Sequence, residues 1–267
     1  MKMSNYSLEH LRYLKKEKQK KTVKLTLQIS IFVLFFALWE LLARFEIINP
    51  FIFSSPSRCV RMLGTLYKTG LLSHVGITLF ETLAGFIIGS VAGFVIAVLL
   101  WWSPMAKQVL DPYLVILNSL PKIALGPLII VWVGAGISSI ITVTLLISIV
   151  VAIMGVLNGF NEVEQGKITL LKTLGATKTQ TFFKVVFPAS IPTTVSVLKL
   201  NIGMSWVGVI VGEFLNSKAG LGYLIVYGGQ VFKMDIVMAA TLVLCALSAG
   251  MYFLVVALEK AILKKRI

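Results

Sequence analysis

The chain has 267 residues, of which 57% are hydrophobic and 13% are charged, and its formal net charge is +14 at pH 7. This composition is typical of an integral membrane protein and argues against a large soluble core. The positive charges lie in short flanks between apolar runs, without a basic stripe interleaved with aromatic residues, which argues against nucleic-acid binding. The cysteines and histidines lack partners at ligand spacing, so we predict neither a disulfide framework nor a metal site.

The N-terminal part of the chain predicts a membrane anchor. Residues 1–24 form a basic tail with eight Lys or Arg. The apolar segment that follows, about Leu25 to Arg44, has no small-residue cleavage site, so we predict an uncleaved first span. Residues 45–73 are more polar and form a loop with a surface helix at about Arg58 to Lys68. The second span is expected at about His74 to Trp102.

Small residues recur at every fourth position of the second span, at Gly85, Gly89, Gly93 and Ala97. Such a face lets another helix approach closely. Two interpretations are open at this point, namely packing between helices of the same chain and an interface with another subunit.

The third apolar segment, about Met105 to Val133, is interrupted by Pro121, Gly126 and Pro127. Proline removes a backbone donor and clashes with the preceding turn, so we expect this helix to kink or break at membrane depth. Lys122 lies between the two prolines, and a lysine that faced lipid would cost about 3 kcal/mol. Pro121, Lys122 and Pro127 are therefore candidates for a translocation path. A structural carbonyl or carboxylate partner for the lysine is the alternative.

The rest of the chain alternates apolar spans with polar connections. After a turn at Gly134 to Gly136, the fourth, fifth and sixth spans are expected at about Ile137 to Leu157, Pro192 to Phe214 and Ile236 to Leu258. The connections are a long polar interruption at residues 158–192 and a Gly-rich loop at about 216–235. Residues 74–258 thus form a five-span core, and residues 259–267 form a basic C-terminal tail.

The polar interruption at residues 158–192 has too much apolar surface for a loop that only connects two spans. Its apolar residues at helical spacing are Leu170, Leu171 and Leu174, and then Phe182, Phe183 and Val186. Gly175 separates the two sets, so we predict two short amphipathic helices joined by an elbow. We expect Pro188 to end the second helix. A segment of this kind suggests docking to a partner.

The distribution of Lys and Arg predicts the orientation in the membrane. Six spans put both termini on the same side. With a cytoplasmic N-terminus, 17 of the 25 Lys and Arg residues face the cytoplasm and six face the other side, while Lys122 and Lys199 lie within spans. Cytoplasmic termini are therefore favoured. The polar interruption then lies in the cytoplasm, where it can meet a cytoplasmic protein or the inner leaflet.

Two glutamates lie toward the outer ends of predicted spans. Glu81 lies about two turns into the second span, and Glu213 ends the fifth span. Ionisable residues within spans are rare and mark gates and paths, so both are candidates for such a role.

The sequence lacks motifs for chemistry of its own. The single Gly-Lys pair, Gly166–Lys167, is followed by Ile168 and so does not form a phosphate-binding loop. Neither a Ser, His and Asp arrangement nor a Rossmann glycine fingerprint is present. We predict no catalytic residue and no bound cofactor, so energised transport would need a nucleotide site on another subunit.

The polar interruption also resembles the E-A-A-x₃-G-x₉-I-x-L-P signature of ABC importer permeases. Matches to its second half are Gly175, Val185, Phe187 and Pro188, whereas Thr169, Leu170 and Leu171 replace the E-A-A half. The chain is similar to the nitrate, sulfonate and taurine branch of these permeases. The segments that carry this similarity are FSSPSRCVRML from Phe53, TLFETLAGF from Thr78, LPKIALGPLIIVWVGAG from Leu120 and GEFLNSKAGLGYLI from Gly212.

The resemblance implies an all-α membrane protein with six transmembrane helices and the type I importer (MetI-like) permease fold. It implies a non-enzymatic permease subunit in the bacterial cytoplasmic membrane. Its partners would be a second copy of the chain, two cytoplasmic ATPase subunits that use ATP and Mg²⁺, and an extracytoplasmic solute-binding protein. The implied solute is a sulfonate, nitrate or taurine. A thiamine-precursor pyrimidine is one alternative, and a stand-alone secondary transporter or channel is another.

The resemblance also implies roles for particular residues. The first cytoplasmic helix would be the coupling helix that inserts into the ATPase, with Gly175 as its elbow. The implied coupling residues are Thr169, Leu170, Leu171, Lys172, Leu174, Gly175, Ala176 and Pro188. Similar permeases usually have Arg where this chain has Glu81, which argues against carrying over their anionic solutes. We expect Glu81 either to change the pairing at an outer gate or to select a zwitterionic or cationic solute.

Overall fold

The computed structural model describes residues 8–264, and all regular elements in that range are helices. The prediction of an all-α protein is confirmed. Five of these helices are long and apolar enough to cross a membrane, and a bent pair, Pro104–Ser119 and Lys122–Val133, makes a sixth candidate span. This number agrees with the six predicted spans. The chain divides into two compact units, Met1–Met62 and Leu63–Ile267.

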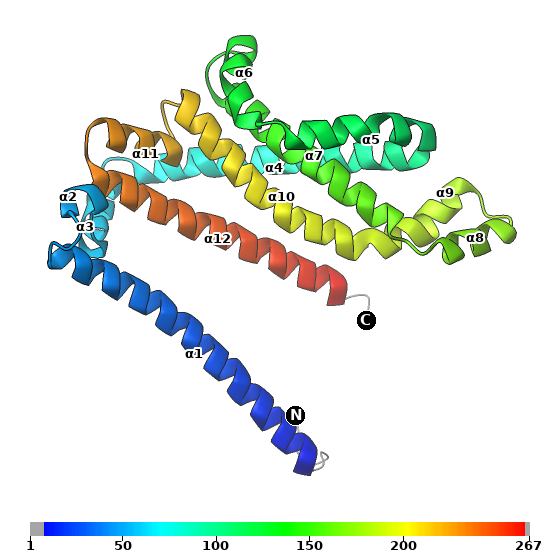
Figure 1. Cartoon of the computed structure of the whole chain (residues 1–267), viewed down its shortest axis with the longest axis horizontal. Coiled ribbons are helices and arrows are strands. Elements are labelled where there is room, and N and C mark those ends of the chain that lie inside the picture. Colours follow the sequence, from blue (N-terminus) through cyan, green and yellow to red (C-terminus); the bar gives the residue numbers. More distant parts are fainter. Residues whose placement is uncertain (1–7, 265–267) are drawn as a thin grey trace. The chain divides into compact units, whose positions relative to one another are not determined.

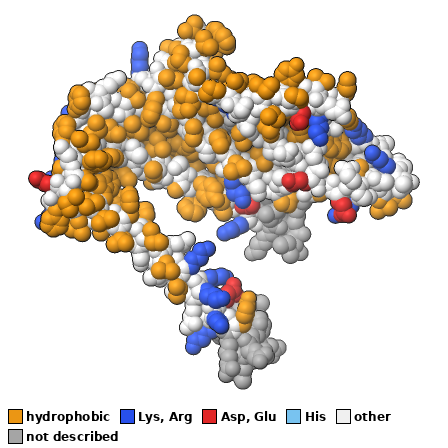
Figure 2. Space-filling model, viewed as in Figure 1, with side chains coloured by type: hydrophobic (Ala, Val, Ile, Leu, Met, Phe, Trp, Pro, Cys, Tyr) orange, Lys and Arg blue, Asp and Glu red, His pale blue; other side chains and the backbone are white. Residues whose placement is uncertain are grey.

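The first unit contains α1 (Leu8–Arg44), the short α2 (Pro50–Phe53) and the beginning of α3 (Pro56–Lys68). The predicted basic tail is thus helical from Leu8 onward, because its Leu, Lys, Glu and Gln residues favour helix. Figure 2 shows Lys side chains gathered on the N-terminal part of α1 and apolar side chains along the rest. Glu40 accepts hydrogen bonds from the Ser57 backbone N–H at 2.9 Å and hydroxyl at 2.8 Å, which stabilises the start of α3.

The second unit has a core of three long helices, α4 (Leu71–Trp102), α7 (Ile137–Asn161) and α10 (Phe187–Asn216). α7 packs against both α4 and α10 (Figure 1). α11 (Leu221–Gln230) and α12 (Met234–Lys264) pack against each other and against α10. An ion pair of 2.7 Å between Lys199 and Glu259 joins α10 to α12.

The small-residue face of α4 packs against α7 of the same chain. A Cβ atom added to Gly85, Gly89 or Gly93 would lie 2.4 Å from a side-chain atom of Thr144, Ser148 or Ala152, respectively. At Gly93 the obstruction is rigid, since the Ile149 carbonyl oxygen lies 3.2 Å from the same added atom. The described residues therefore show the first of the two interpretations of this face, namely close packing between helices of the same chain.

The predicted break of the third apolar segment is confirmed. α5 (Pro104–Ser119) is followed by a 3₁₀ turn, η1 (Lys122–Leu125), and by α6 (Gly126–Val133), and the two parts are bent by 86°. Leu120 and Pro121 leave the helical conformation at the break. The break falls where a proline would lack its donor and clash with the preceding turn.

The polar interruption folds as predicted in outline, but its end differs. It contains α8 (Gln165–Thr173), the single turn α9 (Lys178–Thr181) and a π-helical turn, η2 (Phe182–Val186), which runs into α10. The prediction that Pro188 ends the second helix is wrong, and the candidate span extends from Lys178 to Asn216. The wide π turn lies directly before Pro188. Within it the Phe187 N–H donates to the Phe182 carbonyl, and the chain continues through Pro188 into α10.

The contact between α4 and α7 predicts unequal effects for two identical substitutions. Gly93→Ala should destabilise the folded protein by about 1–3 kcal/mol, because the added methyl meets rigid groups of α7. Gly76→Ala on the same helix should be neutral or stabilising by up to about 1 kcal/mol, because nothing lies within 4 Å of the added methyl and Ala favours helix. Thermal unfolding of both variants in detergent checks this. Equal unfolding temperatures would contradict the packing described.

Candidate functional site

The elbow between α8 and α9 is built by a specific helix end. Gly175 has φ +78°, a left-handed conformation that glycine adopts without strain. The N–H of Gly175 donates to the Lys172 carbonyl at 3.0 Å, and the N–H of Ala176 donates to the Leu171 carbonyl at 2.9 Å. This pair of bonds is the Schellman motif, which ends a helix and reverses the chain direction. A glycine at position 175 therefore suits the left-handed backbone conformation of the elbow.

The second helix of the segment has its own start signal. Thr177 Oγ1 accepts from the Gln180 N–H at 3.2 Å, and Gln180 Oε1 accepts from the Thr177 N–H at 2.8 Å. This reciprocal arrangement is a capping box. The end of α8 and the start of α9 are thus both satisfied within the segment, so its bent shape does not require a partner to form.

The segment presents an apolar face outward. Leu170 is 61% exposed and Leu174 is 74% exposed, whereas Ile168 is buried and Leu171 is half-buried. Thr169 and Lys172 are also exposed. Two exposed leucines on the helix that leads into an elbow are typical of a docking surface. The two exposed leucines are called the leucine pair below.

An aromatic cluster ties this segment to the core. The ring of buried Phe182 lies 4.9 Å from Trp101, 5.4 Å from Trp102 and 5.5 Å from Phe160, between ring centroids. These residues come from η2, the end of α4 and the end of α7. Aromatic pairs at such distances contribute about 0.5–1.5 kcal/mol each beyond area burial. This cluster therefore joins η2 to the ends of α4 and α7.

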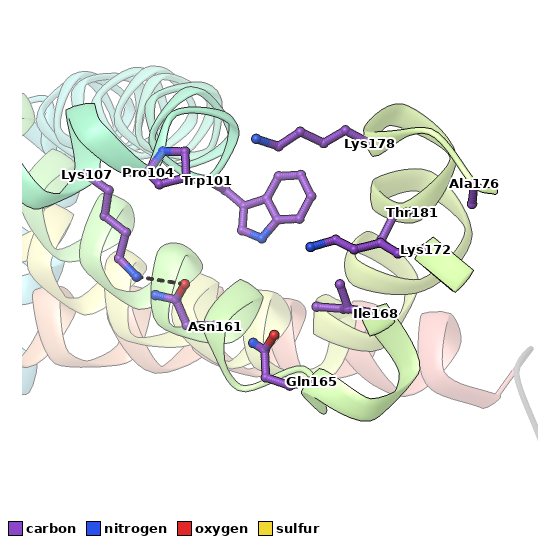
Figure 3. A pocket seen from close by; sticks show the side chains of 10 residues that line it. All are labelled: Trp101, Pro104, Lys107, Asn161, Gln165, Ile168, Lys172, Ala176, Lys178 and Thr181. Atoms are coloured by element: carbon purple, nitrogen blue, oxygen red, sulfur yellow. Dashed lines mark hydrogen bonds between the residues drawn. The ribbon is translucent and has the colours of Figure 1, made fainter. Parts of the chain in front are cut away.

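A cavity of about 400 Å³ lies between the segment and the ends of α4, α5 and α7 (Figure 3). Three lysines, Lys107, Lys172 and Lys178, contribute to its lining. Lys107 donates to the Asn161 side-chain oxygen at 3.0 Å, and Lys178 donates to the Trp102 carbonyl at 2.6 Å. Lys178 also lies 5.7 Å from the centre of the Trp101 ring. The contacts of Lys178 fasten α9 to the end of α4, and that of Lys107 joins α5 to α7.

At the broken third span, Lys122 is half-buried and its ammonium lies 3.5 Å from the Ile147 carbonyl oxygen of α7. Pro121 and Pro127 are exposed on either side of it. This contact agrees with the alternative interpretation of Lys122, in which a carbonyl or carboxylate is its structural partner. The role of the three residues in a translocation path remains a prediction.

At the opposite end of the second unit, α4 and α10 lie beside α11 (Figure 1), and side chains of both helices bond its first turn. Glu213 accepts from the Thr78 hydroxyl at 2.6 Å and from the Gly222 N–H. Thr78 Oγ1 accepts from the Leu221 N–H at 2.8 Å. The N–H groups in the first turn of a helix lack partners within the helix, and these side chains supply them. Glu213 thus positions α11.

Glu81 lies beside this arrangement and has a different environment. Its side chain is fully buried, and its carboxyl group shares a hydrogen bond with the Glu213 carboxyl. The neighbouring charged group is the Glu213 carboxyl. Glu81 contributes to the lining of a cavity of about 290 Å³. The two predicted gate residues are therefore brought together, although they are far apart in sequence.

Thr78 and Phe182 were not predicted as site residues. Thr78 comes one turn before Glu81, which is a helical signal, but its partner Glu213 is 135 residues away. Phe182 was assigned to the apolar face of a short helix, and the tryptophans that surround it come from the end of α4.

Residues 85–264 match the family described as binding-protein-dependent transport system inner membrane component. A probable ABC transporter permease protein of Haemophilus influenzae is 31% identical over 81% of this chain and 88% of its own length. The formylaminopyrimidine transport permease protein ThiX of Halalkalibacterium halodurans is 29% identical over 72% and 76%. The taurine transport system permease protein TauC of Escherichia coli is 23% identical over 84% of each chain.

A solved structure of the MetNI methionine ABC transporter in an inward-facing conformation has the same fold. The matched chain superposes with a TM-score of 0.63 at 23% identity, over 72% of this chain and 95% of that chain.

The hydrogen bonds at the start of α11 predict a difference between two buried threonines of α4. Thr78→Val removes the hydroxyl that joins Glu213 to α11 and leaves the Leu221 N–H unpaired, which should destabilise the protein by about 1–3 kcal/mol. Thr82→Val removes only a bond to the carbonyl of Thr78 in the same helix and should cost less than about 1 kcal/mol. Thermal unfolding of the two variants measures the difference. A smaller loss for Thr78→Val than for Thr82→Val would contradict the capping arrangement.

Proposed function

The chain belongs to the family of binding-protein-dependent transport system inner membrane components, the permease subunits of ABC importers, and we propose that it works as a homodimer docked on two ATPase subunits. The protein is a multi-pass membrane protein and is not an enzyme. ATP hydrolysis belongs to a separate subunit, and an extracytoplasmic binding protein delivers the solute. These assignments replace the alternative of a stand-alone transporter or channel.

The observation that carries the proposal is the leucine pair at a preformed elbow. Leu170 and Leu174 are exposed on a segment whose ends are satisfied internally. Burial of one leucine side chain is worth about 1.5–3 kcal/mol, so docking of both in a groove would contribute substantially to binding. The ATPase is the partner that a permease of this family requires on its cytoplasmic side. Thr169, Lys172 and Ala176 would border the docked surface.

Coupling would follow from the contacts of the segment. The partner ATPase binds ATP and Mg²⁺, and its closure would displace α8 and α9. Phe182 packs against residues at the ends of α4 and α7, and η2 continues into α10 through Pro188. The three core helices would therefore rock as packed units between inward-open and outward-open states.

The proposed orientation has both termini in the cytoplasm. The cytoplasm would then contain the two basic tails, residues 1–24 and 259–267, and the segment 158–192. Residues 45–73 would face the outside. The exposed lysines in the N-terminal part of α1 support this orientation, because they suit the cytoplasmic leaflet of a bacterial cytoplasmic membrane.

We propose that the solute is a small organic molecule of the sulfonate and taurine class that passes the broken third span at Pro121, Lys122 and Pro127. A formylaminopyrimidine-type heterocycle is the alternative. The similarity to TauC supports the sulfonate and taurine class, and the similarity to ThiX supports the heterocycle. The ammonium of Lys122 lies 3.5 Å from the Ile147 carbonyl oxygen of α7, so its positive charge lies against protein groups.

The elbow provides the test. Gly175→Val should reduce solute uptake and solute-stimulated ATP hydrolysis more than ten-fold, because a β-branched residue is strained at φ +78°. The amount of the Gly175→Val variant in the membrane should not change, since nothing lies within 4 Å of the added Cβ. Gly166→Val, in the same segment but with ordinary helical backbone, should retain most uptake. Normal coupling in the Gly175→Val variant would contradict the proposal.

A further inference from the structure

The cavity of about 400 Å³ at the ends of α4, α5 and α7 is lined by lysines from three separate helices and is called the lysine cavity below. Lys107 comes from α5, Lys172 from α8 and Lys178 from α9. Figure 3 shows the side chains of Lys172 and Lys178 extending from their helices toward the ring of Trp101. The other described residues of the lining are uncharged, so the lining carries three positive charges and no negative charge.

The two glutamates that connect α7 to α8 do not balance this charge, because they have other partners. Glu164 pairs with Lys167 at 3.1 Å, and Glu162 accepts from the Thr193 hydroxyl at 3.4 Å. Within residues 8–264, none of the three lysines of the cavity forms an ion pair. The lysine cavity therefore attracts an anion.

Each ammonium group also has hydrogen-bond donors left for a ligand, since an ammonium has three N–H donors. Lys107 uses one on the Asn161 side-chain oxygen, and Lys178 uses one on the Trp102 carbonyl. Lys172 is exposed, and its ammonium has no hydrogen-bond partner in the part of the chain that the structure describes. Because all three lysines line one cavity, these donors suit an anion with several acceptor oxygens.

The lysine cavity and the leucine pair lie on different faces of α8. Ile168 and Lys172, which are four residues apart and so share a helix face, line the cavity. Leu170 and Leu174 share another face and are not among the lining residues. An ATPase docked on the leucine pair would therefore leave the cavity open to a small ligand.

The residues around the lysine cavity are typical of the level at which a span meets the lipid headgroups. Trp101 and Trp102 end α4, and tryptophan is enriched at this level of a membrane. On α5, the apolar side chains of Met105, Val109 and Tyr113 are exposed. A lipid whose acyl chains lay along α5 would bring its headgroup to the cavity.

We propose that the lysine cavity binds an anionic phosphate group, carried by a phospholipid headgroup or free in solution. A phosphate accepts several charge-assisted hydrogen bonds at once, and the volume of the cavity lies in the range of small-molecule sites. The bound phosphate joins α8 and α9 to α5, so it holds the segment that bears the leucine pair against the core. The inference rests on the proposed function only in placing the cavity on the cytoplasmic side.

Thermal unfolding of the purified full-length permease in a neutral detergent tests the site with two probes. The probes are inorganic phosphate, compared with chloride at equal ionic strength, and phosphatidylglycerol, compared with phosphatidylcholine. At least one probe should raise the unfolding temperature of the wild type above that of its reference. Stabilisation by inorganic phosphate would identify free phosphate as a sufficient ligand. Stabilisation by phosphatidylglycerol alone would identify the lipid headgroup as the source.

Two lysines of α8 provide matched variants for titration of the active probe. Lys172→Gln should weaken binding about ten-fold, as expected for the loss of one charge-assisted hydrogen bond. Lys167→Gln removes the same charge from the same helix and should bind like the wild type, because Lys167 pairs with Glu164 and does not line the cavity. If neither probe stabilises the wild type, or if both variants lose affinity equally, the inference is wrong. The measurement uses neither ATPase nor solute, so such a result would leave the proposed function standing, and the Gly175→Val variant tests that function separately.

Discussion

A backbone N–H or carbonyl that leaves its helix within a membrane has no water to bond, so protein groups must satisfy it. The irregular parts of the core follow this constraint. The start of α11 is bonded to Thr78 and Glu213 from α4 and α10. The break at Pro121 continues into a 3₁₀ turn, in which the Ala124 N–H donates to the Pro121 carbonyl at 2.8 Å. These two irregular segments can therefore lie beside the packed helices, because the backbone groups named above have partners.

The same three helices connect the two ends of the second unit. At one end, the aromatic cluster around Phe182 joins the segment that bears the leucine pair to α4 and α7. At the other end, α4, α7 and α10 surround the cavity beside Glu81. Between these ends, α4 and α7 are in close contact at Gly85, Gly89 and Gly93. Close packing of this kind moves as a unit, which is how docking at one end would change access at the other.

Features with a local cause could be predicted from the sequence, and features with a distant cause could not. The elbow follows from Gly175, the broken span from Pro121 and the close helix contact from the glycine spacing. The path of the chain through Pro188 could not be predicted, because the π turn before it leaves no clear sequence signal. The contact between Glu81 and Glu213 depends on how α4 and α10 pack. Helical spacing grouped Leu171 with its neighbours, but the fold half-buries it and exposes Leu170 and Leu174.

The central claim is that the leucine pair is the surface on which the ATPase docks. It is tested most directly by the affinity of the purified ATPase subunit for the full-length permease in nanodiscs. Replacement of both Leu170 and Leu174 by Ser should weaken binding at least ten-fold, since each buried leucine is worth about 1.5–3 kcal/mol. Replacement of Phe183, which is also exposed on this part of the chain, by Ser should have a smaller effect. Unchanged affinity of the double variant would contradict the account.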